Sequence, residues 1–146
     1  PLLVSSLEFV IMKTVLVVED EDWVQEGMQK GVKEVFPQNS PIFQFCDNLK
    51  EAISLVRSKA FDLVSVDGRF RLAELGTPYT PEAGPALIQE LYTLKFPGHV
   101  IFYSANHGQV KKLKSFDCHG RPVHAFEKLT SFGGKQWALE VAKLLV

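Results

Sequence analysis

Four short apolar runs of the sequence each lead into a polar side chain, and together these side chains supply what phosphoryl transfer needs. An acidic pair, a single aspartate, a hydroxyl and a lysine are able to hold a divalent cation and to stabilise a transferring phosphoryl group. Each group alone is a weak signal, since a lone aspartate after a strand more often begins a turn. In chain order the groups are Glu19 with Asp20, Asp67, Ser104 and Lys128.

The apolar runs predict buried β-strands, because interior strands of a parallel sheet are covered on both faces and consist of nearly continuous apolar residues. Gly68 follows Asp67 and allows the chain to turn away there. The predicted strands are Thr14 to Val18, Ile42 to Cys46, Phe61 to Asp67, His99 to Tyr103 and Val123 to Glu127.

Helical spacing of apolar residues separates these runs and predicts five helices. Asp22 is expected to cap the first helix and Asp47 the second, while Thr80 and Pro81 are expected to begin the third. Residues 68 to 80 look like a loop. The predicted helices cover residues 22 to 36, 48 to 59, 81 to 95, 107 to 116 and 134 to 146.

Strands that alternate with helices indicate an α/β fold, here a three-layer sandwich around a five-stranded parallel sheet. Ligands of such sheets gather outside the carboxyl ends of the strands. Because the four polar groups follow strand ends, we expect them to converge on one site.

Bulk properties limit the classes of function. The chain has 146 residues, of which 46% are hydrophobic and 23% charged, which suits one globular domain. A net charge of −1 argues against direct nucleic-acid binding, which depends on basic surfaces. Cys46 and Cys118 form no CxxC motif, which favours a reduced, cytoplasmic protein.

The first eleven residues are apolar but lack the features of a signal peptide and are too short to span a membrane. We treat residues 1–11 as an N-terminal extension and residues 12–146 as the domain. Three interpretations of the extension stay open: a non-native addition, an extra edge strand and a dimer contact.

From Met12 to Val146, the order of the polar strand ends resembles the receiver domain of response regulators, the chemotaxis-regulator-like domain of two-component signalling. The resemblance implies the flavodoxin-like strand order 2-1-3-4-5 and Mg²⁺ as cofactor. It implies that Asp67 accepts a phosphoryl group from a sensor histidine kinase or a phosphotransfer protein, and that a downstream protein target reads the result. It also implies no enzymatic activity beyond the domain's own phosphorylation and dephosphorylation.

The resemblance assigns a role to each residue. Asp20 is implied as a direct Mg²⁺ ligand and Glu19 as one that acts through water, and Asp67 and the backbone carbonyl of Arg69 complete the set. Ser104 is implied to hydrogen-bond the phosphoryl group, and Lys128 to neutralise its charge. Arg71 and Asn106 are candidate modulators of phosphoryl loss.

The sequence also departs from the family pattern. Ala125 occupies the position of an aromatic side chain that usually switches on phosphorylation, and Leu129 replaces a proline. The late position of Gly84 implies an insertion of about nine residues within Phe70 to Pro81, and a long loop beside a site is often functional. Apolar side chains of the insertion either pack on the domain or meet a partner: Phe70, Leu72, Leu75 and Tyr79.

Two alternative functions stay open. A pseudo-receiver would keep the fold as a protein-binding module without phosphorylation, as the departures suggest. Alternatively, Asp20 and Asp22 fit the first motif of haloacid-dehalogenase-type phosphatases, with Ser104 and Lys128 as later motifs. That reading leaves Asp67 unused and offers only Glu140 as a further acid.

Overall fold

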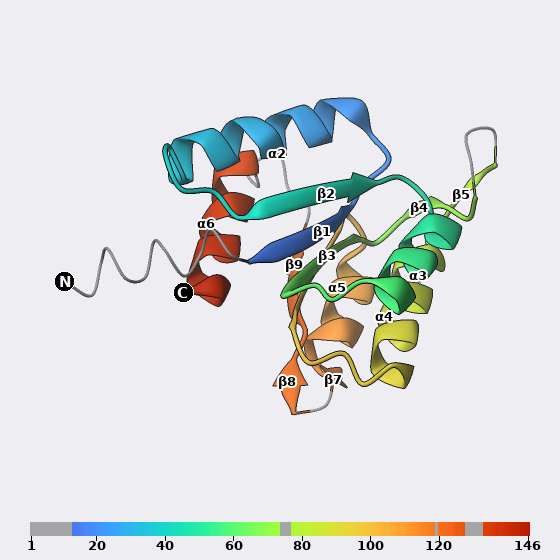
Figure 1. Cartoon of the computed structure of the whole chain (residues 1–146). Coiled ribbons are helices and arrows are strands. Elements are labelled where there is room, and N and C mark those ends of the chain that lie inside the picture. Colours follow the sequence, from blue (N-terminus) through green and yellow to red (C-terminus); the bar gives the residue numbers. More distant parts are fainter. Residues whose placement is uncertain (1–12, 74–76, 119, 128–132) are drawn as a thin grey trace.

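A five-stranded parallel sheet forms the centre of the computed structural model, which describes residues 13–73, 77–118, 120–127 and 133–146 (Figure 1). The strand order is β2-β1-β3-β6-β9, which confirms the predicted order of the five main strands. The neighbouring strands pair in parallel throughout. Their bounds are β1 Thr14–Val18, β2 Ile42–Cys46, β3 Leu63–Asp67, β6 His99–Ser104 and β9 His124–Glu127.

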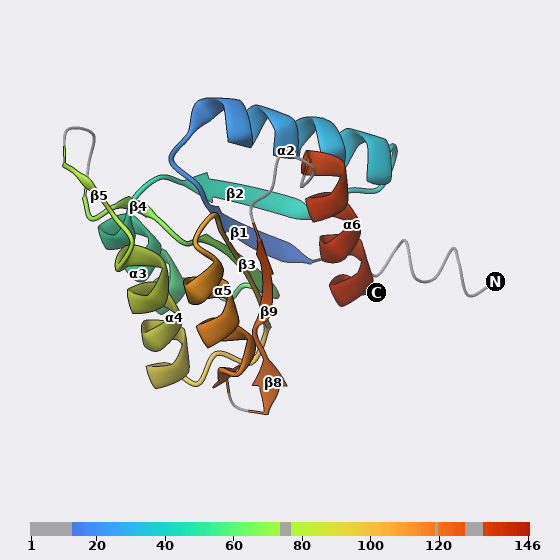
Figure 2. The ribbon, with the colours of Figure 1, turned by 180° about the vertical axis from the view of Figure 1, so that it is seen from behind.

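Five helices cover the two faces of the sheet, as the sequence predicts. Helices α2 and α6 lie on one face and α3, α4 and α5 on the other, and two opposite views show this division (Figures 1 and 2). The helices are α2 Asp22–Val35, α3 Leu49–Ser58, α4 Ala83–Thr93, α5 His107–Lys114 and α6 Gly134–Leu145.

Side chains of each strand alternate between two hydrophobic cores, because successive residues of a strand point to opposite faces. Val15 and Val17 of β1 pack under α2 and α6, whereas Leu16 and Val18 pack under α3 to α5. The core under α2 and α6 holds a buried polar pair, in which Trp137 Nε1 donates to Ser65 Oγ at 2.8 Å. Both side chains are fully buried, so this bond fixes α6 against the central strand.

Helices α2 and α6 approach each other closely because glycines line their contact. A Cβ on Gly31 would overlap the backbone of Gly134 and come within 2.6 Å of Lys135 N. Gly27 also lies in α2, yet a Cβ there would meet nothing within 4 Å. Packing therefore requires glycine at position 31 but not at position 27 of α2. It also requires Gly134 of α6, where a Cβ would overlap the backbone of Gly27.

Helix starts differ from the predicted caps. Asp22 does not cap α2: Glu21 is the N-cap, without a side-chain cap bond, and Asp22 lies in the first turn. Asn48 rather than Asp47 caps α3, and its side chain accepts from Glu51 N. The third helix begins at Ala83, two residues later than predicted, although the Thr80 hydroxyl still accepts from Glu82 N at 3.2 Å.

Two short antiparallel hairpins interrupt segments that the sequence does not mark as strands. The region predicted as a loop after Asp67 contains β4 Phe70–Arg71 and β5 Tyr79–Thr80. A second hairpin joins β7 Asp117–Cys118 to β8 Arg121–Pro122 before β9. The N-terminal extension of residues 1–11 lies outside the described residues.

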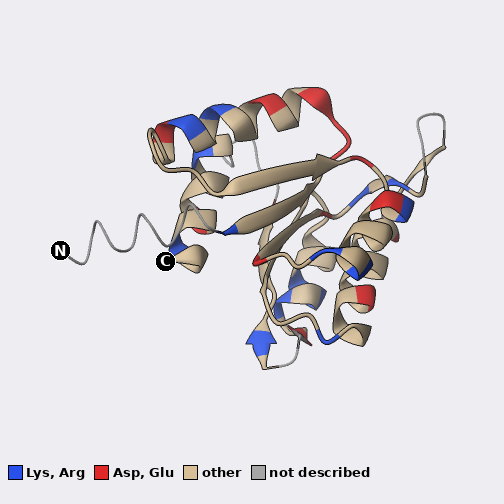
Figure 3. Ribbon diagram, viewed as in Figure 1, with Lys and Arg blue, Asp and Glu red and all other residues tan. Residues whose placement is uncertain are grey.

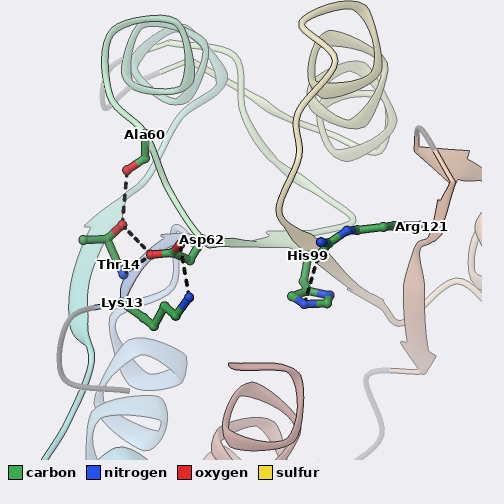
Figure 4. A network of polar contacts seen from close by, with 6 residues as sticks. All are labelled: Lys13, Thr14, Ala60, Asp62, His99 and Arg121. Atoms are coloured by element: carbon green, nitrogen blue, oxygen red, sulfur yellow. Dashed lines mark hydrogen bonds and ion pairs between the residues drawn. The ribbon is translucent and has the colours of Figure 1, made fainter. Parts of the chain in front are cut away.

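A polar network closes the amino-terminal edge of the sheet, opposite the predicted site (Figure 4). Asp62 accepts from Thr14 N at 2.8 Å, and Lys13 Nζ lies 3.9 Å from its other oxygen. Farther along, Arg121 Nη1 lies 3.0 Å from His99 Nε2. Arginine only donates, so His99 must accept and is neutral in this contact. Burial, and next to it the charge of Arg121, lower the pKa of His99.

Glycine substitutions in α2 test the close helix contact. We expect Gly31→Ala to lower the free energy of unfolding by about 1–3 kcal/mol, because the added methyl group overpacks the contact with α6. Gly27→Ala is the matched control, and we expect it to raise stability by roughly 0.5–1 kcal/mol through helix propensity. Urea unfolding followed by circular dichroism measures both. A Gly31→Ala variant with the same free energy of unfolding as the wild type would contradict the tight contact between α2 and α6.

Stability should also depend on pH through His99. Its pKa is lower in the folded than in the unfolded state, so the unfolded state binds more protons between the two values and acidification favours unfolding. We expect His99→Gln to lose part of this acid destabilisation below the ordinary histidine pKa of about 6.5. The measurement is the difference in urea midpoint between the two proteins across pH. Parallel pH profiles would contradict the assignment.

Candidate functional site

Three carboxylates are buried together at the carboxyl edge of the sheet. Glu19 and Asp20 follow β1, and Asp67 is the last residue of β3. Their residues are exposed by 0%, 8% and 3% respectively. Figure 3 shows acidic segments where β1 leads into α2, at this edge of the sheet. Burial of several like charges is costly unless a proton or a cation compensates them.

The Glu19 side chain lies at the carboxyl edge of the sheet, where Tyr103 of β6 forms a hydrogen bond with it. The Tyr103 hydroxyl donates to Glu19 Oε2 at 3.1 Å, and Glu19 N donates to the carbonyl of Cys46 at 3.0 Å. Burial, together with the negative charge of Glu19, raises the pKa of Tyr103 well above its ordinary value. Tyr103 therefore remains a hydrogen-bond donor that fixes the carboxylate.

Asp20 is a buried carboxylate whose pKa is raised by its surroundings. Burial, and next to it the charge of Asp67, raise the pKa of Asp20 to about 6, while the positive charge of Arg71 opposes this shift. Within the described part of the chain, neither carboxylate oxygen of Asp20 has a hydrogen-bond partner. Two buried oxygens without a donor are what a cation would satisfy, so Asp20 fits a metal ligand.

Among the described residues, the carboxylates that lie together are those of Glu19, Asp20 and Glu21, with ligand atoms within 4.8 Å of one another. This set includes Glu21, which the sequence does not single out, and does not include Asp67. Glu21 Oε2 also accepts from Trp23 Nε1 at 2.6 Å, and the Trp23 residue is 70% exposed. Asp67 adjoins the set as the neighbour whose charge acts on Asp20.

The backbone around Asp67 is tightly packed. Arg69 N lies 3.4 Å from Asp67 Oδ1, so the turn after β3 folds back onto the carboxylate. A Cβ on Gly84 would lie 2.5 Å from the carbonyl oxygen of Asp67 and 3.0 Å from Gly68 Cα. The start of α4 thus contacts β3 directly, and Gly84 is adjacent to Asp67 in space despite the insertion.

Ser104 ends β6 and is 4% exposed. Its Oγ donates to Gln109 Oε1 at 2.6 Å and accepts from Asn106 N at 3.0 Å. Asn106 is exposed and is the N-cap of α5, where its side chain accepts from Gln109 N. Asn106 therefore positions the helix that carries Gln109.

The insertion folds as the β4–β5 hairpin, beside the carboxylates of Glu19, Asp20 and Glu21, which together are called the acidic edge. Phe70 is fully buried in the core under α3 to α5, so it packs on the domain, whereas Leu72 and Tyr79 are exposed by 47% and 45%. Two arginines lie over the Tyr79 ring: Arg71 Cζ is 4.7 Å and Arg69 Cζ 5.6 Å from its centroid. Arg71 Nη2 also donates to the Tyr79 hydroxyl at 3.0 Å.

A pocket of about 850 Å³ opens beside Asp67. Arg69 and Ser104 line it together with Trp23 of α2. Lys128, the predicted cation of the site, lies outside the described residues, as do Leu129 and Leu75. The site as described therefore comprises the acidic edge, Asp67, Ser104 and the hairpin arginines.

Sequence reasoning missed two residues that contact predicted site residues. Tyr103 directly precedes Ser104, and strand alternation places its side chain on the face that Glu19 occupies. Gln109 is five residues after Ser104, so one turn of a helix returns it to the strand end. Strand alternation could therefore have predicted the contact of Tyr103 with Glu19. For Gln109, the sequence offers no signal other than its spacing from Ser104.

The structure is similar to those of response regulator receiver domains. A CheY-like receiver domain protein from Methanospirillum hungatei matches with a TM-score of 0.66 and 12% identity, over 92% of this chain and 94% of that chain. The response regulator TrrA from Thermotoga maritima, in complex with Mg²⁺ and BeF, matches with a TM-score of 0.62 and 22% identity, over 91% and 99%.

A third similar structure is the receiver domain of a sensor histidine kinase from Pseudomonas aeruginosa, which has a magnesium ion coordinated in its active site cleft. It matches with a TM-score of 0.62 and 12% identity, over 92% of this chain and 98% of that chain. No protein-family model matches the sequence, and no curated protein sequence matches it significantly. The chain thus has the fold of response regulator receiver domains.

Proposed function

We propose that this protein is a phospho-accepting receiver, in which Asp67 takes a phosphoryl group from a phosphohistidine with the help of Mg²⁺. The observation that carries the proposal is the position of Asp67, buried at the end of the central strand beside the acidic edge and Ser104. The receiver fold and the pocket beside Asp67 support it.

In the proposed reaction, an oxygen of the Asp67 carboxylate attacks the phosphorus atom of the donor. A P–O bond forms, the P–N bond breaks, and the electron pair of that bond returns to the imidazole nitrogen. The phosphoryl transition state has little covalent chemistry for the protein to perform, so positioning and charge neutralisation carry the rate. The Ser104 hydroxyl would donate to a phosphoryl oxygen, and Lys128 is proposed to neutralise its charge.

Asp20 would hold Mg²⁺ directly, with Glu19 acting through water and Asp67 and the Arg69 carbonyl completing the protein ligands. Glu21 joins this proposal because its carboxylate lies with those of Glu19 and Asp20. When bound, Mg²⁺ supplies positive charge that offsets the phosphoryl oxygens and the attacking carboxylate. The unpartnered oxygens of Asp20 support this role.

Several further properties follow from the proposed function. A sensor histidine kinase or phosphotransfer protein would supply the phosphoryl group, and a downstream protein target would read the state, without direct nucleic-acid contact. We propose a cytoplasmic location and no activity on external substrates. No described helix has the length and hydrophobicity to cross a membrane. The phosphatase alternative gains no support from the receiver fold.

A pseudo-receiver is the second candidate, and one observation favours it. The Arg71 charge already acts on Asp20, so part of the negative charge of the acidic edge is offset by the protein itself. In that case the edge would need no metal ion, and Asp67 would remain unmodified. The two experiments below separate this candidate from the phospho-acceptor.

The first experiment tests Asp67 as the acceptor. After incubation with acetyl phosphate and Mg²⁺, we expect intact-protein mass spectrometry to show one added phosphoryl group on the wild type. Asp67→Asn should show none, because an amide is a far poorer nucleophile than a carboxylate. Asp22→Asn, an exposed aspartate in the first turn of α2, should be labelled like the wild type. Labelling of Asp67→Asn at wild-type stoichiometry would refute the assignment.

The second experiment tests the acidic edge as the metal site. We expect Asp20→Asn to weaken Mg²⁺ binding by about tenfold or more, since even outer-shell partners of metal ligands contribute that much. Asp22→Asn should change the affinity by no more than about twofold, because screened surface charges act weakly. Tryptophan fluorescence is the readout, because Trp23 bonds to Glu21. Equal losses of Mg²⁺ affinity in the two variants would contradict the assignment of Asp20 as the direct ligand. A wild type without any fluorescence response to Mg²⁺ would favour the pseudo-receiver.

A further inference from the structure

One side chain, Gln109 of α5, joins three segments around the proposed acceptor. Its Oε1 accepts from Ser104 Oγ at 2.6 Å. Its Nε2 donates to the carbonyl of Gly68 at 3.3 Å and to the carbonyl of Pro81. Gly68 follows the acceptor Asp67, and Pro81 ends the insertion hairpin. Gln109 therefore connects the end of β6, the turn after β3 and the insertion.

The orientation of the Gln109 amide follows from its partners. Carbonyl oxygens only accept, so the NH₂ group must face Gly68 and Pro81. The amide oxygen then faces Ser104, whose hydroxyl must be the donor. The second bond of Ser104, with Asn106 N, uses the serine oxygen as acceptor. The single hydroxyl proton of Ser104 is consequently committed to Gln109.

This commitment excludes a second donation by Ser104. A serine hydroxyl carries one proton, so Ser104 does not donate to Gln109 and to a phosphoryl oxygen on Asp67 at the same time. Both side chains also pack tightly against Gly68, because a Cβ on Gly68 would lie 2.6 Å from both Gln109 Oε1 and Ser104 Oγ. This packing leaves little space for an intermediate position of the hydroxyl. Contact between Ser104 and the phosphoryl group requires the Ser104–Gln109 bond to break.

We propose that Gln109 is a positioning residue that acts through Ser104 as a latch on the unphosphorylated state. The proposal rests on the proposed function, since it needs a phosphoryl group on Asp67 that competes for the Ser104 hydroxyl. When Ser104 turns to that group, Gln109 loses its donor and its link between α5 and Ser104. The phosphorylated state is thereby signalled to α5 and to the base of the insertion at Pro81.

The Ser104–Gln109 hydrogen bond also lowers the affinity of the site for a phosphoryl group, because this bond must break before Ser104 donates to that group. Beryllofluoride with Mg²⁺ is a suitable probe, since the similar TrrA structure contains Mg²⁺ and BeF. We expect Gln109→Met, which keeps the length but removes the amide, to bind this probe about fivefold more tightly. That factor corresponds to about 1 kcal/mol, the usual net contribution of one hydrogen bond.

A double-mutant cycle separates the latch from a structural effect of the substitution. Because the gain passes through Ser104, Gln109→Met should change the affinity by less than about twofold in a Ser104→Ala background. Lys112→Met, an exposed substitution on the same helix, is the matched control and should bind as the wild type does. A fivefold gain that persists without Ser104, or no gain with Ser104, would overturn the latch.

Nuclear magnetic resonance gives a second readout that does not depend on affinity. Saturating wild-type protein with the probe should shift the Gln109 side-chain amide resonances, and Ser104→Ala should suppress most of that shift. If the wild type binds the probe in an Asp67-dependent way but Gln109→Met changes nothing, only the latch is wrong. If the wild type fails to bind the probe at all, the proposed phosphoryl site is wrong and the latch falls with it.

Discussion

Burial of carboxylates at one edge of the sheet is the constraint on which the rest of the structure depends. Glu19 and Asp67 are almost inaccessible to water, and the charge of Asp67, after burial itself, raises the pKa of Asp20 to about 6. Two described neighbours act on these carboxylates. Tyr103 donates to Glu19, and Arg71 acts on Asp20 from the hairpin. An edge built this way favours uptake of a proton or a cation.

The scaffold holds that edge from both faces of the sheet. On one face, the buried Trp137–Ser65 bond and the glycine contact between α2 and α6 fix the helix that begins beside Glu21. On the other face, Gly84 allows the start of α4 to pack against the Asp67 carbonyl. Rigid elements on both sides keep the carboxylates at a fixed separation, which is what a metal or phosphoryl site requires.

The sequence predicted the strands and their order well because long apolar runs and helical spacing are strong local signals. It predicted the caps poorly: Asp47 and Asn48 are adjacent cap formers, and the one that caps α3, Asn48, also forms a long-range β-bridge with Arg71 of the insertion. Two-residue strands carry no period at all, so both hairpins were invisible. The Gln109 contact with Gly68 spans 41 positions, and no local pattern reports it. The role of Lys128 stays a prediction.

The insertion contacts the site from two directions. Through Arg71, held by Tyr79, it places positive charge near Asp20, which favours the ionised carboxylate but by Coulomb's law opposes the approach of a cation. Through Pro81 it accepts the Gln109 amide that holds Ser104. Because the carbonyl of Leu72, directly after β4, accepts a hydrogen bond from Lys50 N, the hairpin is anchored to α3. Asp20 and Gln109 therefore both interact with residues of this one hairpin segment, in a chain where Ala125 offers no aromatic side chain.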